Sequence, residues 1–321
     1  MTTGAVRPGI QAYLDHLKAE RGLAHPTLVA YAGDLERYAA YLDSLGVTGP
    51  ADIDPAVVSG FPVSLTKAGL APASVGRMTV AVRGLHRFWA ADGTTAGDPA
   101  RDVTPPAPGR HLPKALDIAA VEALIEATGG RGPEVTAEQL GDWALVELLY
   151  GTGARISEAL ALTTDDASRL LESDTATLRL TGKGGKQRVV PVGSFARRAL
   201  EAWLVRGRPQ LAGLARRPTT ALFLGTRGAP LTRQNAFNRI EALGRKAGLA
   251  VPVSPHTLRH SYATHLIDGG ADVRVVQELL GHSSVATTQI YTLITVDHLR
   301  EVYRGAHPRA LARPGPRPTV E

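Results

Sequence analysis

Apolar side chains recur at helical spacing through the amino-terminal third of the chain. Between Thr27 and Gly46, leucines and tyrosines return every three or four positions, and a glycine closes the segment, as glycine often does at a helix end. Neighbouring segments show similar patterns, so we expect a small bundle of four main helices. The predicted helices cover residues 13–22, 27–46, 55–68 and 72–91.

The rest of the chain mixes helical segments with one hairpin pattern. Residues 176–182 contain alternating leucines, and residues 186–192 continue the apolar pattern after a KGGK turn. Gly184 and Gly185 can supply the positive φ angles that a two-residue turn requires. We therefore predict a mainly α chain with a small β-sheet, to which residues 222–224 add a short third strand. Helices are predicted over residues 117–128, 137–151 and 155–162, and again between residues 234 and 304.

A proline-rich segment separates the two patterns. TPPAPGRHLP, residues 104–113, holds four prolines and cannot continue a helix. We interpret it as an interdomain linker, and the Pro-rich carboxyl-terminal end as a disordered tail. The predicted organisation is a helical domain at 1–104, a linker at 105–112, a mixed domain at 113–310 and a tail at 311–321.

The composition is typical of a soluble globular protein. Hydrophobic residues make up 44% of the chain, and no apolar run approaches the ~20 residues that a bilayer span requires. The start, MTTGAVRPGIQ, lacks the apolar stretch of a signal peptide, and cysteine is absent. These features predict a cytoplasmic protein with no membrane partner, no disulfide and no thiol nucleophile.

Positive charge is concentrated in the second part of the chain. The formal net charge is +6 and the pI is about 9.7. Residues 1–105 hold nine Lys and Arg against ten Asp and Glu, so they carry −1 and the remaining residues carry +7. This excess favours an anionic partner for the second part of the chain.

Six residues of this second part form a set suited to phosphodiester chemistry without a metal ion. Arginine guanidiniums match phosphate oxygens in geometry and in charge at any physiological pH. A tyrosine hydroxyl can attack phosphorus and hold it covalently. Taken singly, each residue also has an ordinary structural interpretation, such as a helix cap, a core position or a surface ion pair of Arg155 with Glu158. The set consists of Arg155, Lys183, His256, Arg259, His282 and Tyr291.

The clearest helix start of the chain carries two members of this set. Ser254 is a suitable N-cap and Pro255 suits the first helical position. His256 and Arg259 lie three residues apart, so they share a face at the positive end of the helix dipole, where an anion is stabilised. The alternative is that both simply cap the helix and face solvent.

Three other motifs do not support a metal ion or a nucleotide cofactor. His260 lies four residues from His256 and five from His265, but no His-Glu-x-x-His pattern is present and Arg259 would lie beside the cation. GTGARI has isoleucine where a dinucleotide loop needs its third glycine. GKGGKQ lacks the spacing and the Ser or Thr of a phosphate loop. We therefore expect no cofactor and no metal.

In order and spacing, these residues resemble the tyrosine recombinases, most closely the Xer type. The matching stretches include GTGARISEAL (151–160), TGKGGKQRVVPVG (181–193) and SPHTLRHSYATHLIDGGADVRVVQELLGHSSVATTQIYT (254–292). The resemblance covers nearly the whole chain, and its final stretch favours the XerD branch. It implies an amino-terminal SAM-like helical core-binding domain and a carboxyl-terminal α+β catalytic domain. Further similar stretches lie at residues 13–35, 77–89 and 298–310.

The resemblance implies a role for each member of the set. Arg155 and Arg259 would bind the scissile phosphate, and Tyr291 would be the nucleophile. Lys183, the first lysine of the hairpin turn, would be the general acid for the leaving 5′ oxygen.

The remaining roles are accessory. His256 would assist proton transfer, and His282 would donate a hydrogen bond to the phosphate in the transition state. Glu158 would orient Arg155 from behind. The sequence departs from many Xer proteins at Leu293, where they have histidine, and we expect little chemical consequence.

Duplex DNA is the partner that the resemblance implies, held between the two domains as in a clamp. Arg83 and Arg87 lie four apart on the predicted 72–91 helix and share a face, which makes them DNA-binding candidates. The alternative is that they form a basic edge that only faces solvent. Lys186 in the hairpin is a third candidate. By resemblance, the chain also forms a homo- or hetero-tetramer with a second Xer-type recombinase, and the family suggests a DNA translocase as a further partner.

Residues 298–306 are expected to dock on a neighbouring subunit through apolar Leu299 and Val302, with packing on their own domain as the alternative.

The implied function is site-specific recombination through a 3′-phosphotyrosyl intermediate, for chromosome dimer resolution at cell division. A phage or mobile-element integrase, a type IB topoisomerase and a catalytically silent DNA-binding regulator are the alternatives.

Overall fold

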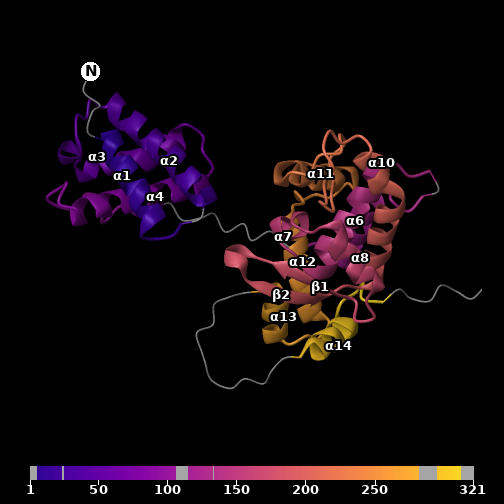
Figure 1. Ribbon diagram of the computed structural model, residues 1–321. Helices are drawn as coiled ribbons and strands as arrows, with labels where there is room; N and C mark the ends of the chain where they lie inside the picture. Colours follow the sequence, from indigo (N-terminus) through magenta and orange to yellow (C-terminus); the bar gives the residue numbers. More distant parts are fainter. Residues whose placement is uncertain (1–5, 24, 106–114, 133, 282–294, 312–321) are drawn as a thin grey trace, which may run out of the picture. The chain divides into compact units, whose positions relative to one another are not determined.

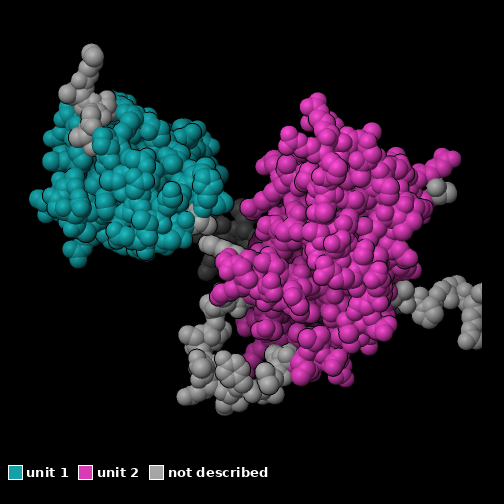
Figure 2. All heavy atoms as spheres, in the orientation of Figure 1, with its two compact units in different colours: residues 1–112 teal, residues 113–321 magenta. Residues whose placement is uncertain are grey.

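Two compact units make up the chain, residues 1–112 and residues 113–321 (Figure 2). The computed structural model describes residues 6–23, 25–105, 115–132, 134–281 and 295–311. Each unit has its own hydrophobic core. Most of the predicted linker, at 105–112, and of the predicted tail, at 311–321, lies outside the described residues.

Unit 1 is a helical bundle, as predicted. Leucine, tyrosine, valine and tryptophan side chains from the four α-helices among its described residues form the core, and a single-turn 3₁₀ helix joins the second to the third. The elements are α1 (Val6–Ala19), α2 (His25–Ser44), η1 (Pro50–Asp52), α3 (Pro55–Lys67) and α4 (Pro72–Ala91) (Figure 1).

Helix α1 begins at Val6, seven residues before the predicted start. Pro8 lies in its first turn, where the missing N–H is not needed. Gly84 of α4 allows a close approach of the two helices, because a Cβ at this position would overlap the hydroxyl of Tyr13. Pro8 therefore fits the packed bundle, although proline usually breaks a helix.

Unit 2 is mainly helical and is built around α6, which packs against α9 and α12 and contacts α5, α7, α10 and α11. No helix in the described part of the chain is both long and apolar enough to cross a bilayer. The helices of unit 2 are α5 (Ile118–Ala127), α6 (Ala137–Thr152), α7 (Ile156–Leu160), α8 (Thr164–Glu172), α9 (Ser194–Ala202), the π-helical segment η3 (Trp203–Gly207), α10 (Arg208–Ala212), α11 (Arg233–Lys246), α12 (Pro255–Asp268), α13 (Val273–Leu280) and α14 (Val296–Ala306).

The predicted hairpin is present, with a longer turn than expected. Strands β1 (Thr177–Thr181) and β2 (Gln187–Pro191) pair antiparallel, with Leu180 opposite Arg188 and Leu178 opposite Val190. Residues 182–186 connect them, including the 3₁₀ turn η2 (Lys183–Gly185), so the two-residue turn was wrong. Gly184 and Gly185 both have φ near 75°, as predicted.

Residues 222–224 do not add a third strand to this sheet. Among the described residues the sheet has two strands; Leu224 makes only an isolated bridge to Pro230, and the preceding Ala221 one to Thr163.

Helix α14 packs on its own unit, against α12, α13 and β2. Leu299 and Tyr303 are buried there, and Val302 packs against the same core. The two apolar side chains that suggested docking on a neighbour are thus used within unit 2, which was the alternative interpretation.

A buried ion pair fixes the segment after α14. The guanidinium of Arg309 forks onto the carboxylate of Glu147 in α6, with 2.8 Å between Nε and Oε2, and it lies 3.8 Å from the ring centroid of Phe195. Glu147 is fully buried and also accepts from Trp143 and Arg131 at 3.2 and 3.3 Å. This anchor was not predicted from the sequence.

Replacing Arg309 should therefore destabilise unit 2. We expect Arg309→Ala to lower the free energy of unfolding by about 3 kcal/mol, because the buried Glu147 carboxylate would keep only its longer hydrogen bonds from Trp143 and Arg131. Urea unfolding of the full chain measures this value. The matched control, Arg304→Ala, removes an exposed arginine from the last turn of α14 and should change stability by less than about 0.5 kcal/mol. Equal effects of the two substitutions would contradict the anchor.

His307, next to this anchor, is buried among the aromatic rings of Tyr150, Tyr262 and Tyr303. Its Nδ1 accepts the backbone N–H of Arg309 at 3.2 Å. Burial, which disfavours the charged imidazolium, lowers the pKa of His307 to about 3. The folded chain therefore holds this ring neutral.

Acid should destabilise the chain through this residue. The unfolded side chain has a pKa of about 6.5, so below that pH the unfolded state binds a proton that the folded state does not. Stability is then lost between about pH 6.5 and the folded pKa of about 3, by up to ~1.4 kcal/mol per pH unit. His307→Asn keeps an acceptor but cannot titrate, so we expect a flatter dependence of unfolding free energy on pH. The exposed His298→Asn should keep the wild-type slope, and the same slope in both variants would rule out this role.

Candidate active site

Arg155 and Glu158 lie at a sharp turn between α6 and α7. Gly153 ends α6 with a φ of 61°, and Arg155 directly precedes α7. The Glu158 carboxylate accepts the backbone N–H of Arg155 at Oε2 and its Nη1 at Oε1, both at 2.8 Å. The Glu158 side chain is only 1% exposed, whereas that of Arg155 is 41% exposed. An ordinary surface ion pair is therefore the wrong interpretation.

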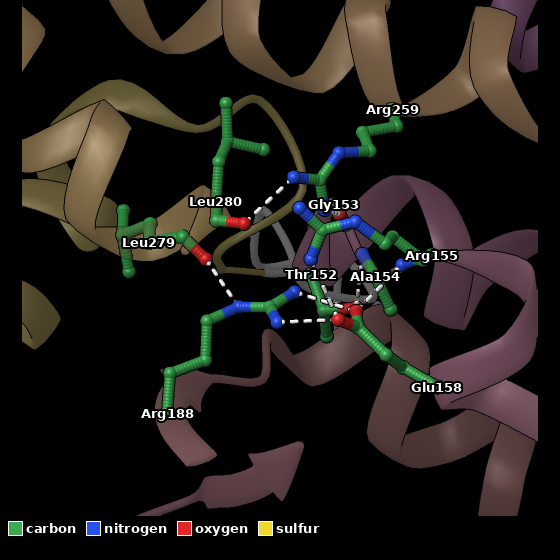
Figure 3. Close-up of polar contacts among 9 residues, drawn as sticks. All are labelled: Thr152, Gly153, Ala154, Arg155, Glu158, Arg188, Arg259, Leu279 and Leu280. Atoms are coloured by element: carbon green, nitrogen blue, oxygen red, sulfur yellow. Dashed lines mark hydrogen bonds and ion pairs between the residues drawn. The ribbon is translucent and has the colours of Figure 1, made fainter. Parts of the chain in front are cut away.

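Arg188 of β2 is a further member of the site that was not predicted from the sequence. Its Nη1 and Nη2 donate to the two oxygens of Glu158, each at 2.7 Å, and its Nε donates to the Leu279 carbonyl at 2.8 Å (Figure 3). Burial alone would raise the pKa of Glu158, but the hydrogen bonds from Arg188 and Arg155 outweigh it and lower this pKa to about 2. The carboxylate is therefore charged at any physiological pH.

Arg259 projects from the first turns of α12, as the predicted helix start implied. The Ser254 side chain caps this helix by accepting the N–H of Thr257. Arg259 is 8% exposed; its Nη1 donates to the Gly153 carbonyl at 2.5 Å and its Nη2 to the Leu280 carbonyl at 2.6 Å. Burial, followed by the charges of Arg155 and Arg188, lowers the pKa of Arg259 to about 10, so the guanidinium stays protonated at neutral pH.

His256 and Lys183 lie on elements that border this cluster. His256 is exposed, one turn before Arg259 on α12. Lys183 begins the turn between β1 and β2, and a Cβ on the preceding Gly182 would lie 3.1 Å from Glu158 Oε1. Its side chain is not among those that the structure describes. Lys186 is exposed at the other end of the turn.

His282 and Tyr291 lie outside the described residues, which end at Gly281 and resume at residue 295. Gly281 ends α13 with a φ of 67°, directly after the carbonyls that Arg188 and Arg259 contact. The DNA-binding candidates Arg83 and Arg87 lie on α4 of unit 1. Among the predicted site residues, the structure thus brings together Arg155, Glu158 and Arg259.

The cluster carries an excess of positive charge. Within the described chain, three guanidiniums, those of Arg155, Arg188 and Arg259, surround the single carboxylate of Glu158 (Figure 3). Their mutual repulsion is one cause of the lowered pKa of Arg259. An anion beside Arg155, the most exposed of the three, would reduce this repulsion. The site is therefore suited to bind an anion such as a phosphate group.

No group of three or more His, Cys, Asp or Glu suited to a metal ion occurs among the residues whose placement the structure gives. His265, five residues after His260, shares a hydrogen bond of 2.8 Å with the Tyr150 hydroxyl.

Comparisons with known proteins identify relatives of this chain. The model of the phage integrase family matches residues 114–298, and that of the phage integrase N-terminal SAM-like domain matches residues 10–93. A tyrosine recombinase XerD of Mycobacterium tuberculosis is 52% identical over 308 residues, which cover 94% of this chain and 97% of that protein. A tyrosine recombinase XerD of Bifidobacterium longum is 42% identical over 97% of this chain and 100% of its own length.

Solved structures share the fold at low sequence identity. The XerH site-specific recombinase in a post-cleavage complex with palindromic difH has a TM-score of 0.65 and 23% identity, over 88% of this chain and 77% of that one. A lambda integrase dimer bound to a COC′ core site has a TM-score of 0.66 and 17% identity, over 89% and 99%. The chain therefore belongs to the phage integrase family, as a site-specific tyrosine recombinase of the Xer type.

Proposed function

We propose that this chain cuts and rejoins duplex DNA at a specific site by attack of Tyr291 on the scissile phosphate. The attack would form a 3′-phosphotyrosyl bond and release a 5′ hydroxyl. The 5′ hydroxyl of a partner strand would then attack phosphorus and displace the tyrosine. One phosphodiester replaces another, so the bond changes require neither ATP nor a metal ion.

The observation that carries this proposal is the excess positive charge around Glu158. Arg155 and Arg259 would donate to the non-bridging oxygens of the phosphate, whose charge grows in the transition state. Both guanidiniums are held in place before DNA binds, by Glu158 and by two backbone carbonyls respectively. Donors that are fixed in advance need no reorganisation when the charge develops, and each is typically worth ~10²-fold or more in rate. His282 would add a third donor.

Proton transfer requires two further groups. A tyrosine with an ordinary pKa near ~10 is mostly protonated at neutral pH, so Tyr291 needs a base, and His256 is our candidate. The departing 5′ oxygen needs a proton, for which we assign Lys183. The turn that carries Lys183 lies against Glu158 through Gly182, which supports its place near the cluster.

Duplex DNA is the proposed partner of both units. Arg83 and Arg87 line a groove of about 600 Å³ between α1, α2 and α4, together with Arg21 and the ring of Phe88. Such a basic groove suits contacts to phosphate groups, which position a protein on DNA and make its affinity depend on salt. Lys186, exposed on the hairpin turn, is a further candidate in unit 2.

We further propose that the reaction resolves chromosome dimers at cell division, in the cytoplasm. The similarity to proteins named tyrosine recombinase XerD, from 37% to 52% identity over nearly the full chain, supports this use. By the same similarity, four subunits would assemble on two DNA sites, either identical or shared with a second Xer-type recombinase, with a DNA translocase as a regulator.

Covalent trapping tests the reaction. Incubation with duplexes of the host's candidate recombination site, nicked so that the cleaved fragment diffuses away, should give a protein–DNA adduct that survives denaturant. Tyr291→Phe should bind the same duplex with similar affinity and give no adduct, because only the hydroxyl is removed. Site-specific binding by the wild-type chain without any adduct would favour a catalytically silent regulator instead.

The leaving group tests Lys183 separately. We expect Lys183→Met to slow cleavage of ordinary DNA by ~10²-fold or more, as is typical for loss of a general acid. A duplex with sulfur in place of the bridging 5′ oxygen should restore most of this rate, because a thiolate departs without a proton. Lys186→Met, three residues away, is the control and should cleave both duplexes like the wild-type chain at saturating DNA. Equal loss on both duplexes in Lys183→Met would reject the general-acid role.

A further inference from the structure

Arg188 occupies a position in the hairpin that an arginine rarely occupies. It lies opposite Leu180 and on the same face of β2 as Val190, and both of these side chains are fully buried. The Arg188 side chain is itself only 9% exposed. A charge at a core-facing position is retained only when it is paired and hydrogen-bonded, so its partners indicate what it does.

Those partners belong to different segments of the site. The fork of Arg188 binds both oxygens of Glu158 at 2.7 Å, and its Nε binds the Leu279 carbonyl at 2.8 Å. Glu158 in turn holds Arg155 through the backbone and the side chain. One planar group thereby joins the strand after the Lys183 turn, the start of α7 and the end of α13.

The end of α13 is held by two arginines. The last carbonyls of a helix have no partner within it, and they carry the negative end of its dipole. Arg188 binds the Leu279 carbonyl and Arg259 binds the next one, that of Leu280. Gly281 then packs closely, because a Cβ on it would lie 2.9 Å from Arg188 Cδ. The backbone that leads into His282 thus starts from a position fixed by Arg188.

We propose that Arg188 is a positioning residue for strand cleavage, which presents Arg155 to the scissile phosphate by fixing the Glu158 carboxylate. This inference rests on the proposed function of the site. Arg188 does not contact the phosphate in this scheme and acts through its neighbour. Its planar fork is required, because a lysine ammonium carries the charge but cannot bind two carboxylate oxygens and a carbonyl in the same geometry.

Single-turnover cleavage of the nicked duplex, at saturating enzyme, tests this role in the full chain. We expect Arg188→Gln to slow cleavage by ~10²-fold, and Arg188→Lys by ~10-fold or more although it keeps the charge. The affinity for DNA should change by less than about threefold in both, since neither removes a DNA contact in this scheme. Arg179→Gln, an exposed arginine on β1 of the same hairpin, is the matched control and should cleave at the wild-type rate.

Two further measurements separate positioning from a merely structural role. In a Glu158→Gln background, Arg188→Gln should cost less than about threefold in rate, because residues that act through one another are not additive. A methylphosphonate at the scissile position removes one charged oxygen. On this substrate the cleavage rate of Arg188→Gln should lie within about tenfold of the wild-type rate. Both readouts compare rates of folded enzyme, and Arg188→Lys gives the same comparison with the charge retained.

The outcomes are distinct. If the wild-type chain cleaves and both Arg188→Gln and Arg188→Lys cleave at its rate, the positioning role is overturned and the proposed function stands. The same deficit on both phosphates, or full additivity with Glu158→Gln, would also overturn it, because loss of structure slows every substrate alike. A wild-type chain that forms no adduct would overturn the proposed function and this role with it.

Discussion

The Glu158 carboxylate lies almost completely buried between the guanidiniums of Arg155 and Arg188, and the rest of the site depends on this contact. Without a negative charge at its centre, the cluster of three arginines would repel itself inside a region of low dielectric constant. The one carboxylate holds Arg155 and Arg188, and two backbone carbonyls hold Arg259, so the three charges are fixed but not neutralised. An enzyme that binds a phosphate must also stabilise the negative charge that develops in the transition state. Guanidiniums that are fixed in place and keep a net positive charge meet both requirements.

The fold of unit 2 supports this centre from several segments that are distant in sequence. Helix α6 forms the middle of the unit and ends at Gly153, whose carbonyl accepts from Arg259 of α12. The hairpin contributes Arg188, and α13 contributes the carbonyls of its last residues. Six residues before Gly153, Glu147 of α6 forms the buried pair with Arg309 that fixes the segment after α14. The same helix therefore carries contacts to the site and to the carboxyl-terminal anchor.

Much of the fold could be predicted because its signals are local. Periodic apolar residues placed the helices of unit 1, and the alternating leucines with two glycines placed the hairpin. The start of α1 was missed since Pro8 and Gly9 oppose a helix locally, while buried Val6 and Ile10 favour it only through packing on the bundle. The turn length was also misjudged, because the two glycines lie inside a longer turn that a backbone hydrogen bond of 2.7 Å from Gly182 N to the Lys186 carbonyl closes.

Arginines whose own motif indicates their chemistry could be predicted, whereas those whose role depends on a distant buried partner, one in the site and one in the carboxyl-terminal anchor, were missed. Arg155 and Arg259 follow from their motifs, whereas Arg188 and Arg309 are ordinary arginines until their buried carboxylates are known. One signal was available for Arg188: in the alternation of β2 it falls on the apolar face with Val190, where a charge needs a partner. Nothing comparable marks Arg309, whose partner lies 162 residues away.

The central claim is that a tyrosine, and no metal ion or cofactor, carries the DNA strand in this cationic site. The most direct measurement is to digest the trapped protein–DNA complex, formed in the presence of EDTA, and to locate the nucleotide by mass spectrometry. We expect the nucleotide mass on the peptide that contains Tyr291, joined through a 3′-phosphate. A nucleotide on another side chain, or an adduct that forms only when a divalent cation is added, would contradict the claim.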